Sequence, residues 1–281
     1  MLLHSKSKPE KQEIPPSGSC LMAPCGADNV MEFFFQTRKL TVGYNGKVVV
    51  RDIEVSIKKG QILTLIGPNG AGKSTILKSI TKQLKAICGV VYIGGKQSES
   101  ISMSEMARRV AVVLTERPRP ELMTCGDVVA FGRYPYTGML GVLSESDKEK
   151  VDEALLMVNA TKLKDKSFSE VSDGQLQRIM LARAICQEPE IIVLDEPTAF
   201  LDIRYAVEIL DILQDMSNRR GLTVIMSLHE LNYARPISDL VMCVKSGVAQ
   251  YIGTPEMIFT KEVISNLFDL PHGYYEQLFG I

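Results

Sequence analysis

Residues 67–75 combine glycines, a lysine and hydroxyls at a spacing that suits the binding of phosphate. The segment reads Gly67, Pro68, Asn69, Gly70, Ala71, Gly72, Lys73, Ser74, Thr75. Its glycines let successive backbone N–H groups curl around phosphate oxygens. The ammonium of Lys73 reaches the β- and γ-phosphates of a nucleotide, and the hydroxyl of Ser74 is a ligand for Mg²⁺. The segment therefore predicts a site for a nucleoside triphosphate and its Mg²⁺.

Two adjacent acids follow an apolar run later in the chain. Residues 191–194 are Ile, Ile, Val and Leu, and Asp195 and Glu196 come directly after them. The end of a buried strand is where an α/β sheet presents its site. Asp195 is suited to hold Mg²⁺ through water, and Glu196 to polarise an attacking water. Alone, the pair is equally compatible with a helix cap, but beside residues 67–75 it predicts hydrolysis of the triphosphate.

Short apolar strands must position both groups of residues. Residues 62–66 form an apolar run directly before the glycine-rich segment, and residues 74–84 have a helical pattern after it. Residues 110–114, 191–194 and 224–228 are continuous apolar runs, which are typical of strands covered on both faces. Because these runs alternate with helical stretches, we expect an α/β fold with a P-loop NTPase core and a mostly parallel sheet.

The segments around this core have different patterns. Asn45-Gly46 reads as a turn between two strands, and residues 53–57 alternate strictly between apolar and polar side chains. This pattern predicts a small N-terminal antiparallel β-subdomain.

Residues 116–172 carry signs of helices instead of strands. Thr124 with Asp127, and Ser146 with Glu149, have the spacing of capping boxes. We therefore expect an inserted α-helical subdomain over about 116–172.

The composition excludes several classes of protein. The chain has 281 residues, of which 45% are hydrophobic and 23% charged, as in ordinary globular proteins. A formal net charge of -1 gives no electrostatic reason to expect nucleic acid as a partner. No apolar run approaches the roughly 18 residues of a membrane-spanning helix. Residues 1–28 are polar and lack periodicity, which predicts a flexible N-terminal extension before one domain over 29–281.

Residues 171–178 read Val-Ser-Asp-Gly-Gln-Leu-Gln-Arg and resemble the signature motif, usually LSGGQ, of ATP-binding cassette (ABC) proteins. Read alone, this segment predicts only an N-capped helix, but it lies just upstream of the strand that ends at Asp195. In the family, the start of the signature helix faces the γ-phosphate of an ATP held by a second subunit. The resemblance covers about residues 31–281 and assigns four positions to this motif: Ser172, Asp173, Gly174 and Gln175.

Three further positions match the family pattern in order. Tyr44 stands where ABC proteins place an aromatic side chain that stacks on adenine. Asp202 ends a segment, residues 199–202, that resembles the D-loop, and His229 resembles the switch histidine that contacts the γ-phosphate. A strand-end tyrosine and a structural histidine are the alternatives at positions 44 and 229. The resemblance thus implies catalysis by Lys73, Glu196 and His229.

Two positions depart from the pattern. Glu116 occupies the slot of the Q-loop glutamine, and Asp173 replaces a glycine of the signature. A carboxylate at position 116 can still ligate Mg²⁺, so we expect Glu116→Gln to weaken the Mg²⁺ dependence of ATP binding. The alternative is that Glu116 points to solvent. An acid at position 173 suits the start of a helix.

Family membership implies a mechanism and a set of partners. Two cassettes meet head to tail with two ATP molecules between them, and each ATP contacts the P-loop of one subunit and the signature of the other. Because this chain has one of each motif, the resemblance implies a homodimer. It also implies polytopic membrane permease subunits, an indirect link to a substrate-binding protein, and a peripheral location on the cytoplasmic face of the inner (plasma) membrane.

Softer features resemble one group within the family. Residues 126–135, residues 198–202 and the Gly-Thr-Pro-Glu at 253–256 are similar to importers of iron-siderophore, haem or cobalamin cargo. The cargo itself contacts other subunits.

The expected helical insertion, near Glu116 and at about residues 133–141, offers a surface for the permease. We expect its exposed aromatic and apolar side chains to dock there, namely Tyr134, Tyr136, Met139 and Leu140. Internal packing of these side chains is the alternative.

Two other functions remain open from the sequence. One is a soluble ABC protein that acts on ribosomes or DNA, although the second cassette or long coiled coil of such proteins is missing. The other is a non-hydrolysing, nucleotide-gated module, against which Glu196 argues. A neighbouring permease gene would separate the first from an importer, and a phosphate-release assay the second.

Overall fold

The computed structural model describes residues 33–114, 122–138 and 141–279. Its strands are β1 (Phe35–Tyr44), β2 (Lys47–Ile57), β3 (Ile62–Ile66), β4 (Cys88–Ile93), β5 (Lys96–Gln97), β6 (Val110–Val113), β7 (Ile191–Asp195), β8 (Thr223–Ser227), β9 (Leu240–Lys245) and β10 (Val248–Gly253). These strands of the described residues form one sheet in the order β5-β4-β1-β2-β10-β9-β3-β8-β7-β6. The expected α/β class is confirmed.

Five neighbouring strands, β9, β3, β8, β7 and β6, run parallel. Every residue of β3, β7 and β8 is buried, so the sheet is covered on both faces there, as the continuous apolar runs predicted. Ser227 at the end of β8 pairs with Asp195 on one side and Leu65 on the other. The carboxyl ends of three strands therefore meet at one edge, and the segments that follow them lie close together.

The expected antiparallel part of the sheet contains β1, β2 and β4. Asn45 and Gly46 connect β1 to β2 with φ angles of 49° and 77°, as in the two-residue turns that suit a twisted hairpin. The strand that follows the turn and the alternating residues 53–57 belong to one strand, β2. Asp52, with a φ of 53°, marks an irregularity inside it that offsets the polar and apolar alternation.

A narrow seam joins the antiparallel part to the rest of the sheet. Strands β2 and β10 pair only between Arg51 and Val248. Side chains from both sides of the seam, such as Val50 on β2 and Val244 on β9, belong to the same buried core. Side-chain packing therefore holds the two parts of the sheet together more than backbone hydrogen bonds do.

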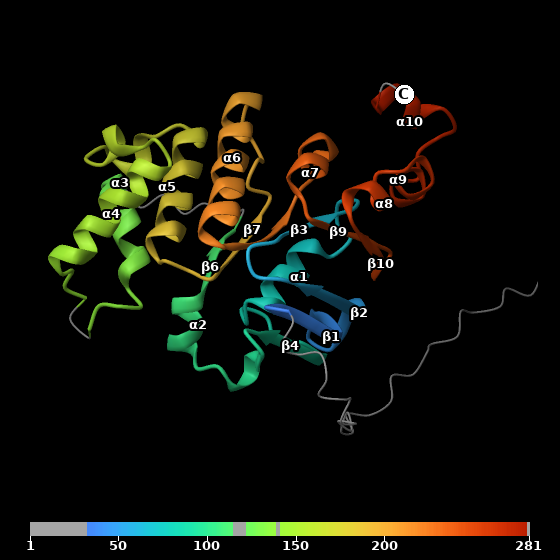
Figure 1. Ribbon diagram of the computed structural model, residues 1–281, viewed down its shortest axis with the longest axis horizontal. Coiled ribbons are helices and arrows are strands. Elements are labelled where there is room, and N and C mark those ends of the chain that lie inside the picture. Colours follow the sequence, from blue (N-terminus) through green and yellow to red (C-terminus); the bar gives the residue numbers. More distant parts are fainter. Residues whose placement is uncertain (1–32, 115–121, 139–140, 280–281) are drawn as a thin grey trace, which may run out of the picture.

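Helices cover both faces of the sheet. They are α1 (Lys73–Ile80), α2 (Met103–Arg109), α3 (Cys125–Ala130), α4 (Glu145–Met157), α5 (Asp173–Cys186), α6 (Ile203–Arg220), α7 (Leu231–Ile237), α8 (Pro255–Ile258), α9 (Lys261–Phe268) and α10 (Tyr274–Phe279), with short 3-10 helices η1 (Ser98–Ser100), η2 (Phe131–Arg133), η3 (Thr161–Leu163) and η4 (Phe168–Glu170). Helix α1 packs into one core and α3 to α6 into the other. Figure 1 shows α3, α4 and α5 gathered at one end of the molecule, beside α6.

The glycine-rich segment leads into a helix, as expected, but that helix is shorter than the pattern suggested. Helix α1 ends at Ile80 and not near residue 84. Lys82 adopts a φ of 61°, which an α-helix cannot accommodate. The apolar spacing continued past this break, so periodicity alone placed the end too late.

Between residues 122 and 172, the described residues form helices joined by turns and loops, and their one β-type pairing is an isolated bridge between Thr124 and Ser167. The capping box at Thr124 and Asp127 is confirmed. The second one was wrong by two positions, because α4 begins after Ser144, whose partner is Asp147. The sequence contains two Ser-x-x-acid patterns, one from Ser144 and one from Ser146. Arg133 donates to Asp147 Oδ1 at 2.9 Å and so favours the pattern that starts at Ser144.

Residues 1–28, Glu116, Met139 and Leu140 lie outside the described residues. The domain boundaries 29–281 and 116–172 stay predictions. Within the described ranges, no helix combines the length and the apolar character needed to cross a bilayer.

Candidate nucleotide-binding site

The glycine-rich loop lies between the end of β3 and the start of α1 and requires its glycines. Gly67 and Gly72 have φ angles of 147° and 105°. A Cβ atom on Gly67 would lie 2.0 Å from the carbonyl oxygen of Val244, and one on Gly72 would lie 2.4 Å from Val50 Cγ2. Side chains are thus excluded where the backbone turns into the helix, and the first N–H groups of α1 face the loop.

Lys73 lies inside this loop and is only 5% exposed. Its Nζ donates to the carbonyl oxygens of Gly67 (2.8 Å) and Pro68 (3.2 Å). Burial lowers the pKa of the ammonium, while the negative charges of Glu196 and Asp195 oppose this shift. The sequence-predicted lysine and both acids therefore share one electrostatic environment.

A serine that the sequence analysis missed holds the two acids. The Ser227 hydroxyl donates to Asp195 Oδ1 at 2.6 Å, and the backbone N–H of Glu196 donates to Ser227 Oγ at 3.0 Å. Asp195 is 7% exposed. The only sequence signal for Ser227 was a polar residue near the carboxyl end of a buried strand, and its partner followed from the register of β7 against β8.

Glu196 and His229 come together across the same edge. Glu196 Oε1 lies 2.5 Å from His229 Nε2, and since a carboxylate only accepts, the imidazole donates. Glu196 also has a left-handed backbone, with a φ of 52°. Non-glycine residues with positive φ are uncommon and concentrate at functional sites. The predicted base and the predicted switch histidine are thus direct neighbours.

Tyr44 lies beside the loop, at the end of β1. Its hydroxyl accepts a long hydrogen bond of 3.5 Å from the hydroxyl of Thr75, and 46% of the residue is exposed. An exposed ring at this place is available for stacking on a flat ligand.

The signature residues form the start of α5. Ser172 Oγ accepts from the Gln175 N–H at 3.4 Å, and Gln175 Oε1 accepts from the Ser172 N–H at 3.2 Å, which makes a capping box. Gly174 packs on the ring of Tyr205 in α6, where a Cβ would be 3.0 Å from the nearest ring atom. Ser172 and Asp173 are exposed. Their surface position leaves them available to a second molecule.

The segment after Glu196 ends in a helix cap. Asp202 Oδ1 accepts from the Tyr205 N–H at 3.0 Å and so starts α6. Phe200, just before it, has a φ of 64° and is 80% exposed. The D-loop assignment of Asp202 therefore falls on a residue with a structural role in this chain.

Two further side chains were missed. The Thr198 hydroxyl donates to Glu230 Oε2 at 3.0 Å. Thr198 follows Glu196 by two positions, and Glu230 follows His229 directly. An acid at a helix start was the only hint in the sequence, and it pointed to a cap and not to a partner on another loop.

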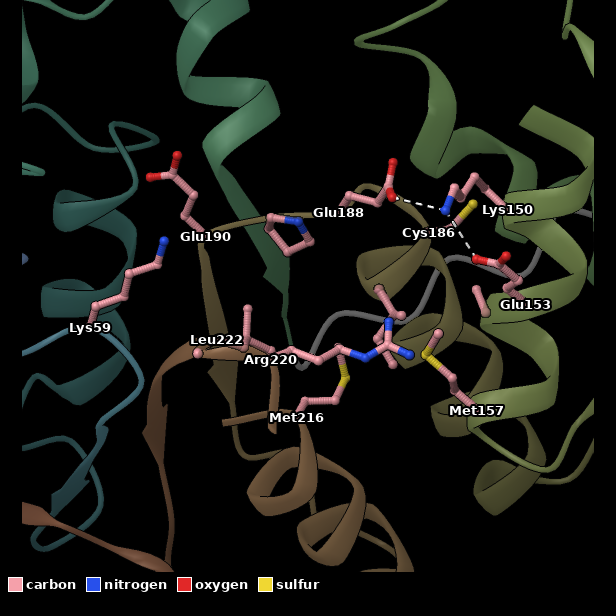
Figure 2. A pocket seen from close by; sticks show the side chains of 14 residues that line it. Lys59, Lys150, Glu153, Met157, Cys186, Glu188, Glu190, Met216, Arg220 and Leu222 are labelled. Carbon is pink, nitrogen blue, oxygen red and sulfur yellow. Dashed lines mark hydrogen bonds and ion pairs between the residues drawn. The ribbon is translucent and has the colours of Figure 1, made fainter. Parts of the chain in front are cut away.

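A cavity of about 210 Å³ lies away from this site. It opens at the amino ends of β7 and β8, opposite Asp195, where α4, α5 and α6 approach one another (Figure 2). Lys150 pairs there with Glu153 (3.1 Å) and Glu188 (3.2 Å), which raises the pKa of its ammonium. Met157 lines the cavity beside them. This cavity is therefore separate from the glycine-rich loop.

Comparisons with known proteins agree with this geometry. The ABC transporter family model matches residues 50–199, over half of the chain. An uncharacterised ABC transporter ATP-binding protein of Methanocaldococcus jannaschii is 43% identical over 87% of this chain and 84% of its own. The iron(3+)-hydroxamate import ATP-binding protein of Bacillus subtilis is 34% identical, with 83% and 87% covered. The ferric enterobactin transport ATP-binding protein of Escherichia coli is 32% identical, with 83% and 86% covered.

A solved structure described as a metal-chelate type ABC transporter in an inward-facing conformation is similar over most of this chain. Its TM-score is 0.74 at 26% identity, over 85% of this chain and 90% of that one. This chain contains the glycine-rich loop, the acids after β7 and the capped signature helix. Its relatives are ABC transporter ATP-binding proteins, and they align with it over most of their length. The chain belongs to the ABC transporter family, as an ATP-binding subunit.

Proposed function

We propose that this protein is the ATP-hydrolysing subunit that powers an importer of iron-siderophore or related metal-chelate cargo. The observation that carries the hydrolytic part is the edge where Lys73, Glu196 and His229 meet. The cargo class rests on relatives that are named for iron-hydroxamate import and ferric enterobactin transport. These names favour an importer over a soluble ABC protein without a transport role.

The proposed reaction uses groups already in place. The γ-phosphate lies in the loop of residues 67–75, where the Lys73 ammonium exchanges its carbonyl partners for phosphate oxygens. Glu196 accepts a proton from the attacking water, and His229, which donates to Glu196, orients this carboxylate and contacts the γ-phosphate. Tyr44 stacks on the adenine. The hydrolysis is thus general-base catalysis beside a preorganised phosphate-binding loop.

Mg²⁺ fits the donor set at this edge. Asp195 supplies one carboxylate at the strand end and Ser74 one hydroxyl at the start of α1. Within the described ranges, no group of three or more His, Cys, Asp or Glu side chains could hold a metal alone. Mg²⁺ commonly keeps waters and binds through one or two protein ligands plus phosphates. When bound, the ion neutralises charge on the β- and γ-phosphates.

A homodimer completes the site. Ser172 and Asp173 are exposed at the start of α5, and their helix is braced by Arg178, whose guanidinium lies over the Tyr205 ring of α6. Two apolar side chains, Ile203 and Val207, are 75% and 40% exposed at the start of α6. An exposed apolar face beside exposed signature residues supports a second copy of the chain there.

The remaining partners follow from the transport role. We propose that the dimer binds polytopic permease subunits at the cytoplasmic face of the membrane and acts on a substrate-binding protein only through them. The segment at Tyr134 is the proposed docking surface. Glu116, outside the described residues, stays a predicted ligand of the Mg²⁺.

Replacement of the loop lysine tests the hydrolytic function. Lys73→Ala removes the only lysine of the loop, so ATP-dependent phosphate release should fall at least about 100-fold. A phosphate-release assay on the purified protein measures this.

Lys82→Ala is the matched control. Lys82 also donates to two backbone carbonyls, those of Ser98 (2.9 Å) and Ile101 (3.0 Å), but lies beyond the end of α1. Its phosphate release should equal that of the wild type. Near-normal turnover by Lys73→Ala would reject the site.

A further inference from the structure

The two loops that carry Glu196 and His229 are joined by a hydrogen bond outside the reacting groups. One loop follows β7 and leads to α6, and the other follows β8 and leads to α7. Helices α6 and α7 are neighbours (Figure 1). Between them, the hydroxyl of Thr198 donates to Glu230 Oε2 at 3.0 Å.

The Thr198 end of this bond is fixed. Thr198 is 3% exposed, and its carbonyl accepts from the Leu201 N–H at 3.2 Å. A buried hydroxyl needs a partner, and a carboxylate acceptor makes the bond charge-assisted. The turn also holds Glu196, whose carbonyl accepts from the Ala199 N–H at 3.1 Å. Thr198 is therefore a rigid anchor two residues from the proposed base.

The Glu230 end sets the position of His229. The residue before His229, Leu228, is buried, and its N–H donates to Leu65 O at 3.1 Å. The residue after it, Glu230, caps α7 with its carbonyl, which accepts from the Ala234 N–H at 3.1 Å. His229 itself is exposed, so its backbone is held mainly by these two neighbours.

We infer that Thr198 and Glu230 form a positioning pair that holds the imidazole of His229 against the carboxylate of Glu196. In this inference both residues act through the two loops and not by contact with the substrate. A shift of about 1 Å in a positioned group can cost about 100-fold in rate, so a single hydrogen bond between the two loops has a large effect on turnover. This inference rests on the proposed ATPase function and deepens it.

A pair of substitutions at Thr198 tests the inference. Thr198→Val keeps the side-chain volume but removes the hydroxyl, whereas Thr198→Ser keeps the hydroxyl. We expect kcat for ATP to fall about tenfold in Thr198→Val, with KM within about twofold of the wild type, because the glycine-rich loop is untouched. Thr198→Ser should retain most of the wild-type kcat.

Substitutions at Glu230 give the reciprocal test. Glu230→Ala should lower kcat as much as Thr198→Val, and Glu230→Gln, whose amide oxygen can accept the same bond, should recover most of it. The double variant Thr198→Val/Glu230→Ala should lose no more than either single one. Losses that multiply would show that the two side chains act independently and would overturn the pair.

The control removes a hydroxyl at the other end of α7. Ser238 Oγ donates to Ala234 O at 2.6 Å, and Ser238→Ala should leave kcat unchanged. Circular dichroism melting separates reduced turnover from a reduced folded fraction. An unchanged kcat in folded Thr198→Val, or an effect on KM alone, would overturn the inference. No hydrolysis by the wild type would instead reject the proposed function.

Discussion

The carboxylate of Glu196 depends on its neighbours for both position and backbone geometry. Its N–H is held by Ser227 and its side chain by His229, while its φ of 52° lies in the left-handed region. This conformation costs energy that the surrounding bonds must offset. A change in the chemistry of the side chain that keeps its volume therefore tests its role without disturbing the loop.

Glu196→Gln should keep ATP binding and reduce hydrolysis by at least about 100-fold, because an amide cannot accept the proton of the attacking water. The bound ATP is then not hydrolysed and should hold two copies of the chain together. Size-exclusion chromatography with ATP should therefore show a dimer. Glu190→Gln is the control, since Glu190 lies at the opposite end of the same strand and binds Arg109. A monomer that hydrolyses ATP normally would contradict the general-base role.

Single site residues could be predicted from the sequence where the groups that act together are neighbours in the chain. The residues from Gly67 to Thr75 and the acids after β7 could be predicted as a site because neighbouring positions act together. Ser227, Thr198 and Glu230 could not, because their partners lie on another loop and depend on the register of β7 against β8. The register between two strands that are distant in the chain could not be predicted from this sequence alone.

Arg133 connects three elements at the helical end of the molecule. It donates to Asp147 in α4 (2.9 Å), and to Cys186 O (2.8 Å) and Glu188 (2.9 Å) at the end of α5. Asp147 also accepts from the Ser144 hydroxyl at 2.6 Å. The hydrogen bonds from Ser144, and then that from Arg133, lower the pKa of the Asp147 carboxyl to about 2.

Asp147→Asn should destabilise the protein by about 2 kcal/mol at pH 7, because a carboxyl whose pKa is about 2 in the folded state, against an ordinary value of 3.8, favours folding by roughly that amount. This stabilisation is present above pH 4 and is lost as the pH falls toward 2. The difference between the two proteins should therefore shrink by about half at pH 3. Urea unfolding at pH 7 and pH 3 measures it.

The control for this prediction is an ion pair at the surface. Arg219 Nε lies 2.6 Å from Asp215 Oδ1, with both side chains largely exposed. Asp215→Asn should change stability by less than about 0.5 kcal/mol at either pH. An equal loss in both variants would mean that burial of the Arg133 cluster adds nothing.

Local sequence patterns were not sufficient to predict where helices begin. Ser144 and Ser146 both begin a Ser-x-x-acid pattern, and the choice between them depends on Arg133, which belongs to another element. The strands of the parallel sheet were easier, because burial on both faces leaves a continuous apolar run that needs no partner to be recognised.

At the scale of the whole molecule, the expected docking surface is only partly available. Tyr136 is engaged internally, since its hydroxyl donates to Gln187 O at 3.0 Å and its ring lies near the guanidinium of Arg133. Tyr134 stacks on Phe131 but is 59% exposed. The alternative of internal packing thus applies to Tyr136 more than to Tyr134, and Tyr134 is the better position for a test.

Tyr134→Glu should release the protein from membranes that contain its permease while leaving basal phosphate release unchanged, because a charge at the centre of an apolar contact is costly to desolvate. Co-sedimentation with such membranes measures this. Tyr274→Glu alters an exposed tyrosine in α10 and should stay membrane-bound. Equal retention of both variants would exclude this face as the docking surface.

The seam between β2 and β10 affects how the sheet responds to nucleotide. Tyr44 lies on one side of it and the glycine-rich loop on the other, and few backbone bonds cross between them. Apolar packing resists separation but tolerates small sliding, so the seam is the natural place for shear. A nucleotide with its base on Tyr44 and its phosphates in the loop acts as a crosslink over this seam, and amide hydrogens such as that of Arg51 should then exchange with solvent more slowly.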